Sequence, residues 1–433
     1  MAKDKIAPPN SPGSRHGAEP FAYRDRDFYV FLGVRFLSAV AAQILSVAVG
    51  WQIYTIARTP LALGLVGLCQ FVPMFLLTLP AGDIVDRRDQ RHIYALSLSV
   101  SAVCAILFVV LSDMKIAHTL PFYAVLVLLG AGRGFAGPAG SSLLPFLVPF
   151  ERLPKAIGWS SSVFQTAVIA GPALGGLLYV LGPVAAYSTC VLCFSAAALG
   201  VTSLGGRRRA GGLNRQTSAY ERVGEGVRFV RSRPVVLGAL SLDLFAVLLG
   251  GAVALLPAYA RDILHVGPLG LGMLRSAPAL GAALMAIGFG RWPLQRHAGK
   301  AMFAAVAVFG LATLVFGLST SFSLSLAALF VLGGADMVSV FIRTSLIQMA
   351  TPDAMRGRVS AVNMLFIGAS NELGEFESGL TASWWGTVPA VVVGGIGTLL
   401  VAALWMWGFP KLRQVDRLSE VVPQEQQAGP GNG

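Results

Sequence analysis

The chain has 433 residues, of which 55% are hydrophobic and only 12% are charged. Soluble domains carry about 25% charged residues, so this composition excludes an ordinary water-soluble fold. The formal charge of +12 suits either nucleic acid or an anionic membrane surface, and the positions of the basic residues decide between these partners.

Apolar stretches of about 20 residues, each long enough to cross a hydrocarbon layer about 30 Å thick as a helix, follow one another along the chain. Residues 1–27 are hydrophilic and lack a signal-peptide pattern, so they form an expected cytoplasmic tail. We therefore predict an all-α polytopic membrane protein of twelve transmembrane helices in two six-helix bundles. The predicted spans are 28–56, 61–81, 93–112, 120–147, 160–180, 184–204, 234–257, 268–290, 301–318, 322–348, 359–380 and 387–408.

These spans divide into an N-terminal bundle over residues 28–204 and a C-terminal bundle over residues 234–408. Between them, the basic segment 205–233 has regularly spaced apolar residues and is expected to contain a helix on the membrane surface. Residues 409–433 are rich in Gln, Gly and Pro, which predicts a disordered cytoplasmic tail.

Basic residues are distributed unevenly between the two sides of the predicted membrane. Of the 33 Lys and Arg residues, 26 fall in the tails and the alternate loops that share their side, and the opposite loops hold only Arg58, Lys115 and Arg261. Cytoplasmic loops carry such an excess, which predicts a multi-pass protein of the cell (inner) membrane with both termini cytoplasmic. The basic surplus then lies near anionic lipid headgroups, and nucleic acid is not an expected partner.

The connection between the second and third spans reads GDIVDRRDQR over residues 82–91. It resembles the G-x-x-x-D-R-x-x-R-R signature of the major facilitator superfamily, which implies two bundles that alternate between faces of the membrane. Gly82 allows close packing against a neighbouring helix end, while Asp86, Arg87 and Arg91 supply charge-assisted hydrogen bonds. The resemblance implies a cytoplasmic latch, whereas the residues alone also fit a solvated positive-inside loop.

The fifth span contains Gly158, Gly171, Pro172, Gly175 and Gly176. Their spacing resembles the G-x8-G-x3-G-P-x2-G-G antiporter signature of the superfamily, with Ala167 replacing one glycine, and this implies export. Small residues at such spacing also serve ordinary close helix packing, and that interpretation remains open.

Further segments resemble the branch of the superfamily that includes the enterobactin exporter and the macrolide-efflux pumps. The matching pieces are residues 35–36, 79–82, 255–257 and 351–358, spread over almost the whole chain. The enterobactin exporter has an acid where this chain has Arg133, so the substrate does not carry over directly.

Five acidic residues fall inside predicted spans, where a charge at the bilayer centre costs about 2.5 to 3.5 kcal/mol and must face a cavity or a partner. Glu377 is close enough to the end of its helix to be an interfacial charge, which leaves four. Asp243 lies about 13 Å from the cytoplasmic start of its helix, near the midplane of the membrane, where transporters bind their cargo. We therefore predict that its carboxylate carries protons. A structural ion pair with an intramembrane arginine is the alternative. Glu372 and Glu375 share a helical face because they are three residues apart, and Asp336 is the fourth acid of this set.

Four arginines also fall inside the predicted spans: Arg35, Arg133, Arg275 and Arg343. Arg133 precedes Gly137 in a pattern that resembles a superfamily motif linked to proton coupling. Arg35 either has a functional role or reaches the inner interface, and Arg343 is expected to reach that interface with its long side chain.

These features together predict a proton-driven secondary transporter that exports a small amphipathic compound of drug or siderophore type. The sequence contains no phosphate-binding loop for ATP, so an ion gradient supplies the energy. The alternative is a proton symporter that imports a metabolite, while a receptor or an intramembrane enzyme is disfavoured. We expect a monomer with small-molecule substrate, protons and lipid as its partners, and neither a cofactor nor a metal.

Overall fold

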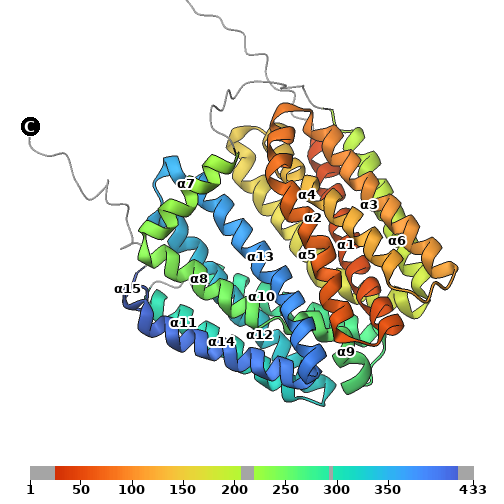
Figure 1. Ribbon diagram of the computed structural model, residues 1–433. Coiled ribbons are helices and arrows are strands. Elements are labelled where there is room, and N and C mark those ends of the chain that lie inside the picture. The colour runs from red at the N-terminus through yellow and green to blue at the C-terminus, as the bar shows by residue number, and fades with distance from the viewer. Residues whose placement is uncertain (1–24, 206–218, 292–295, 418–433) are drawn as a thin grey trace, which may run out of the picture.

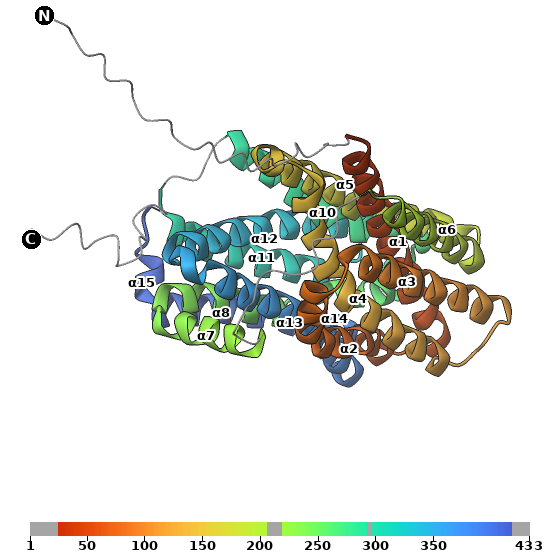
Figure 2. The ribbon, with the colours of Figure 1, turned by 90° about the horizontal axis from the view of Figure 1, so that it is seen from above.

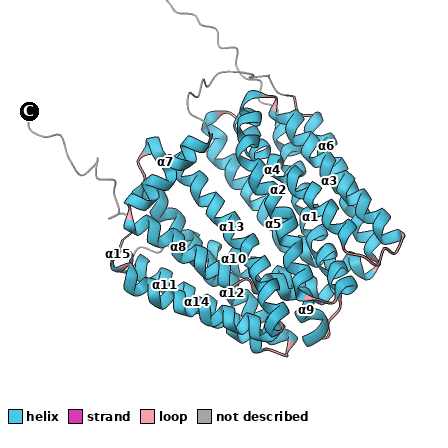
Figure 3. Ribbon diagram, in the orientation of Figure 1, coloured by secondary structure: helices cyan, strands magenta, loops and turns pink. Residues whose placement is uncertain are grey.

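The computed structural model of the protein describes residues 25–205, 219–291 and 296–417, and every regular element in these ranges is helical (Figure 3). Six long helices form the N-terminal bundle. They are α1 (Asp25–Ala57), α2 (Pro60–Arg87), α3 (Gln90–Asp113), α4 (Leu120–Leu147), α5 (Leu153–Val180) and α6 (Pro183–Thr202), with the short turn η1 (Phe150–Arg152) before α5. Their apolar residues pack into one continuous core.

The C-terminal bundle is formed by α8 (Pro234–Leu249), α10 (Pro268–Arg291), α11 (Ala298–Leu318), α12 (Phe322–Ala350), α13 (Asp353–Trp385) and α14 (Thr387–Gly408). The seventh span is not one regular helix. It breaks after α8 at Gly250 and Gly251 and continues through η2 (Ala252–Leu255), α9 (Leu256–Ala258) and the π-helical turn η3 (Tyr259–Ile263). A Cβ atom on Gly251 would lie 2.6 Å from the carbonyl oxygen of Gly374, so the glycine allows α13 to approach the break.

Eleven of these segments are long and apolar enough to cross a membrane. The remaining long helix, α13, spans 33 residues but carries several charges, and it packs among the others against α2, α8 and α14. The prediction of twelve transmembrane helices in two bundles is therefore confirmed, and Figures 1 and 2 show the two bundles side by side.

Two shorter helices flank the C-terminal bundle. The helix α7 (Ala219–Ser232) lies in the basic segment between the bundles, and its apolar residues Val223, Val227 and Val230 pack against α8 and α13. The turn α15 (Pro410–Arg413) follows α14 and buries Leu412 completely, so the packed chain extends to residue 417, beyond the predicted start of the disordered tail. Residues 1–24, 206–218 and 418–433, on which the remaining predictions for the tails and linker fall, lie outside the described residues.

The two bundles touch near one end of the molecule. We call this the outer end, after the side on which the sequence predicts Arg58, Lys115 and Arg261 to lie, and we call the opposite end, with residues 82–91 and α7, the inner end. At the outer end, a Cβ atom on Gly379 of α13 would lie 2.7 Å from the Cα of Gly64 of α2. Figure 1 shows α2 and α13 diverging from this contact toward the inner end.

Candidate functional site

A cavity of about 420 Å³ lies beside the break in the seventh span. Helices α8, α10, α12 and α13 supply most of its walls, and Gln165 and Val168 of α5 bring the N-terminal bundle to it. Its ionisable lining residues are Asp243, Arg275, Asp336, Arg343 and Glu375. Three acidic residues named from the sequence therefore meet in one cavity.

The carboxylate of Asp243 on α8 forms an ion pair with the guanidinium of Arg343 on α12. Both side chains are buried, with 6% and 3% of their surfaces exposed. The expectation that Arg343 reaches the inner interface is wrong, because a buried acid on the facing helix holds the guanidinium inside the bundle. The structure thus contains the ion pair that was the alternative account of Asp243, and it also places Asp243 on the cavity wall.

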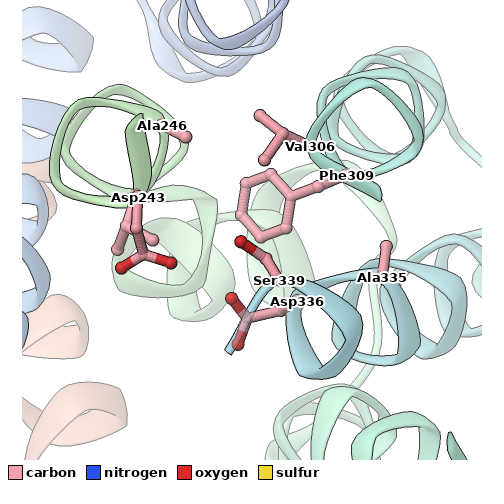
Figure 4. A pocket seen from close by; sticks show the side chains of 8 residues that line it. Asp243, Ala246, Val306, Phe309, Ala335, Asp336 and Ser339 are labelled. Atoms are coloured by element: carbon pink, nitrogen blue, oxygen red, sulfur yellow. The ribbon is translucent and has the colours of Figure 1, made fainter. Parts of the chain in front are cut away.

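Asp336 lies on α12 across a small space from Asp243 (Figure 4). This space has a volume of about 10 Å³, enough for about one water-sized group, and the hydroxyl of Ser339 also lines it. Within the described parts of the chain, Asp336 has no hydrogen bond and no ion pair. Among the described residues, it is a cavity carboxylate without a charged partner.

Glu375 of α13 lies where the cavity meets the contact between the bundles. A Cβ atom on Gly67 of α2 would lie 2.9 Å from its Oε2 atom, and electrostatic interactions join Glu375 to Arg275. Arg275 of α10 in turn donates a hydrogen bond to the hydroxyl of Ser46 on α1. Charged groups of the C-terminal bundle therefore contact the N-terminal bundle where the cavity meets the contact between the bundles.

Glu372 is on the same side of α13 but does not line the cavity, and its Oε2 would lie 3.5 Å from a Cβ on Gly67. Arg133 of α4 donates a hydrogen bond of 2.9 Å to the side-chain oxygen of Gln70 and interacts electrostatically with both glutamates. Arg133 thus brings a positive charge from the N-terminal bundle to Glu372 and Glu375.

Arg35 lies apart from the cavity-lining acids. Its guanidinium lies 5.4 Å from the centre of the Phe164 ring on α5, and it does not line the cavity. Aromatic rings attract a cation at this distance, so the contact stabilises Arg35 inside the N-terminal bundle.

The predicted latch residues lie at the inner end of α2 and the start of α3. Arg91 donates a hydrogen bond of 2.6 Å to the carbonyl oxygen of Leu204, at the end of α6 in the same bundle. A Cβ on Gly82 would meet nothing within 4 Å, so the expected close packing of Gly82 is not made in this structure. Arg87 is exposed, and the side chain of Asp86 lies outside the described part.

Asp89 caps α3 beside the latch. Burial raises the pKa of its carboxyl, but hydrogen bonds from the backbone and side chain of Arg91 outweigh this effect and lower the pKa below its ordinary value. Asp89 therefore stays ionised and holds the Arg91 guanidinium within its own bundle.

The small residues of α5 make contacts with both bundles. Gly171 and Gly175 face Gln43 and Ile44 of α1, whereas Gly176 approaches Pro268 at the start of α10. Pro172 likewise approaches Gly272 of α10, while Gly158 has open space around it. The outer part of the predicted motif thus forms a contact between the bundles.

Polar contacts at the outer end were not foreseen from the sequence. The hydroxyl of Tyr54 on α1 donates to the carboxylate of Asp262 on η3, and Arg58 lies 3.9 Å from the same carboxylate. Arg261 donates to the hydroxyl of Thr55. The sequence places the basic residues Arg58 and Arg261 on the predicted outer side. It does not indicate that they lie close together, because they are far apart in the chain.

The profile of the transmembrane secretion effector family matches residues 19–430. The chain is 26% identical to Enterobactin exporter EntS of Citrobacter koseri, over 89% of this chain and 92% of that protein. It is 26% identical to Enterobactin exporter EntS of Escherichia coli O157:H7, over 91% of this chain and 94% of the relative.

Two solved structures share the fold. A bacterial homologue of the human lysosomal transporter Spinster, in an inward-facing and occupied conformation, has a TM-score of 0.68 at 14% identity, with 90% of this chain and 98% of that chain covered. A bacterial homologue of the iron transporter ferroportin, in an inward-facing state, has a TM-score of 0.67 at 15% identity, with 90% and 99% covered.

Proposed function

The chain belongs to the transmembrane secretion effector family of the major facilitator superfamily, and we propose that it is a proton-driven exporter of a small amphipathic compound of siderophore or drug type. The observation that carries this proposal is the cavity of about 420 Å³ that holds three carboxylates and two arginines beneath a closed outer contact. The family consists of transporters, and the relatives that cover nine-tenths of the chain carry the name of a siderophore exporter.

Cargo enters from the cytoplasm in this proposal, with both termini on that side of the inner membrane. The cavity walls combine apolar groups such as Val247, Phe309 and Leu332 with the polar groups of Gln165 and Asn371. Ligand sites typically have this composition, in which apolar walls bind the cargo and a few polar groups orient it. An amphipathic compound fits such a surface better than a sugar or an inorganic ion.

Protons compete with cargo for the acidic groups of the cavity. Its five ionisable residues comprise three acids and two arginines, so their combined formal charge is −1 when all are ionised. Since an uncompensated charge is costly inside the membrane, one proton or one positive cargo group must balance it. A proton that enters from outside displaces the cargo, and the proton leaves when the site faces inward again.

Alternating access requires the outer contact to open and the inner end to close. The contacts of Gly64 with Gly379 and of Gly176 with Pro268 separate in this step, while Arg91 and its neighbours engage the other bundle. Because Glu375, Arg133 and Arg275 meet at the bundle contact, the protonation of Glu375 changes the attraction between the bundles. A proton moving down a membrane potential supplies about 2.3 kcal/mol per 100 mV.

The experiment that tests this proposal measures retention of a radiolabelled catecholate siderophore, together with a panel of antibiotics, in cells that lack their own exporters. Cells that make the protein should retain less of at least one compound, and collapse of the proton gradient should abolish the difference. Greater accumulation in producing cells would instead support import by proton symport, and equal retention throughout the panel would contradict both proposals for these compounds.

A further inference from the structure

A second cavity, of about 760 Å³, lies away from the charged site at the inner end of the N-terminal bundle. It is formed by the N-terminal parts of α1 and α5, the last residue of η1 and the residue that follows α4, and α1 and α5 pack together. Its lining residues are Phe28, Tyr29, Leu32, Val148, Arg152, Lys155, Ala156, Trp159 and Val163. We propose that this cavity binds an anionic phospholipid of the cytoplasmic leaflet.

The cavity faces away from the transport pathway. Ala156 lines it, whereas Gln165, nine positions later on the same helix, lines the charged cavity. Nine residues correspond to about two and a half helical turns, so the two side chains point to opposite sides of α5. The second cavity therefore lies on the side of α5 that faces away from the cargo site.

The lining of this cavity changes from polar and aromatic at the rim to apolar at depth, as a phospholipid changes from its headgroup to its acyl chains. Phe28, Leu32, Val148 and Ala156 are buried and form an apolar floor. Tyr29 and Trp159 are 67% and 55% exposed at the rim, and aromatic residues of this kind settle at the headgroup level of a bilayer. Val163 lies about 12 Å deeper along α5 than Lys155, which is a depth that acyl chains occupy.

The charge of the rim selects the headgroup. Arg152 and Lys155 are exposed lining residues, and no acid lines this cavity in the described part of the chain. The nearby acids Asp27 and Glu151 are not lining residues. Basic pockets between helices on the cytoplasmic side bind anionic headgroups, so we infer that a phosphate group without a compensating choline or amine occupies this rim.

The test uses the purified full-length protein, titrated with dioleoyl phosphatidylglycerol or dioleoyl phosphatidylcholine and observed by native mass spectrometry. The wild type should bind one phosphatidylglycerol in preference to phosphatidylcholine. Lys155→Gln should weaken that binding about fivefold, and Arg152→Gln with Lys155→Gln should weaken it further, because each basic group near the headgroup adds to the attraction. Both side chains are exposed, so these variants should remain folded.

Lys300→Gln is the matched control, since Lys300 is an exposed lysine at the inner start of α11, and it should leave the preferred binding unchanged. Equal affinity of the double variant and the wild type for phosphatidylglycerol would overturn the proposal. Equal binding of the two lipids by the wild type would also overturn it. So would loss of siderophore binding in the double variant with lipid binding intact, because the cavity would then be an entrance for cargo.

Discussion

Arg343 of α12 and Asp243 of α8 form an ion pair between two helices of the C-terminal bundle, with 3% and 6% of their side chains exposed. Isolated, either charge would carry a high desolvation cost in this environment, and together they neutralise each other. The same carboxylate lines the cavity, so it is available both to stabilise the bundle and to carry a proton.

Replacement of Asp243 separates these two roles. Asp243→Asn leaves the Arg343 guanidinium buried without its acid, so the free energy of unfolding should fall by about 3 to 5 kcal/mol and export should stop. Thermal unfolding in detergent and siderophore retention in cells measure the two effects. The double variant Asp243→Leu with Arg343→Met should regain the lost stability and still fail to export, and export at the wild-type rate would remove Asp243 from the coupling mechanism.

Unlike Asp243→Asn, the substitution Asp336→Asn should not lower the stability of the protein. Asp336 is half-buried and has no ion pair or hydrogen bond among the described residues, so neutralising it removes an uncompensated charge and should leave the unfolding temperature unchanged or raised. The rate of export should lose most of its dependence on external pH, because the cavity then lacks one of its three acids. A pH profile identical to that of the wild type would exclude Asp336 as a proton carrier.

The sequence alone predicted the twelve spans and the two bundles, because charge and hydropathy report directly on crossing a membrane. It also predicted that Asp243, Asp336 and Glu375 each face a cavity or a partner, since the cost of an intramembrane charge leaves few other positions. The partner of Asp243 was not predicted, because Arg343 is 100 positions away and its depth alone suited the interface. The break at Gly250 and Gly251 was missed because hydropathy is insensitive to backbone irregularity.

Close contact between the bundles at Gly379 should control which face of the protein is open. Gly379→Leu adds a side chain 2.7 Å from the Cα of Gly64, and overpacking of this kind costs about 1 to 3 kcal/mol, so the outer-closed state should lose population about tenfold or more. Distances between spin labels at Lys115 and Thr320, exposed on opposite bundles, report the change. Gly288→Leu is the control, since a Cβ there meets nothing within 4 Å.

If the label distances in Gly379→Leu match those of the wild type, the contact between Gly64 and Gly379 does not limit opening. A shift of the same size in Gly288→Leu would show that added bulk alone, and not its position, alters the distribution. Either result would contradict the proposed role of this contact in alternating access.

Asp262 should stabilise the same outer closure through its polar contacts. Asp262→Asn removes the ion pair with Arg58 and weakens the hydrogen bond from Tyr54, so the closed population should fall about fivefold, less than with Gly379→Leu. Added salt should reduce the difference because these charges are half exposed. Asp113→Asn, at another exposed outer aspartate, should have no effect, and an unchanged label distance in Asp262→Asn would show that the contact is incidental.

Transport in inside-out membrane vesicles tests the central claim most directly. The protein is produced in cells without their own exporters, the vesicle interior is made acidic, and uptake of a radiolabelled catecholate siderophore is followed over time. Proton-driven export predicts that the compound accumulates in these vesicles and that dissipating the pH gradient stops the accumulation. Uptake only into right-side-out vesicles that are acidic outside, as a proton symporter would show, would contradict the assignment of export.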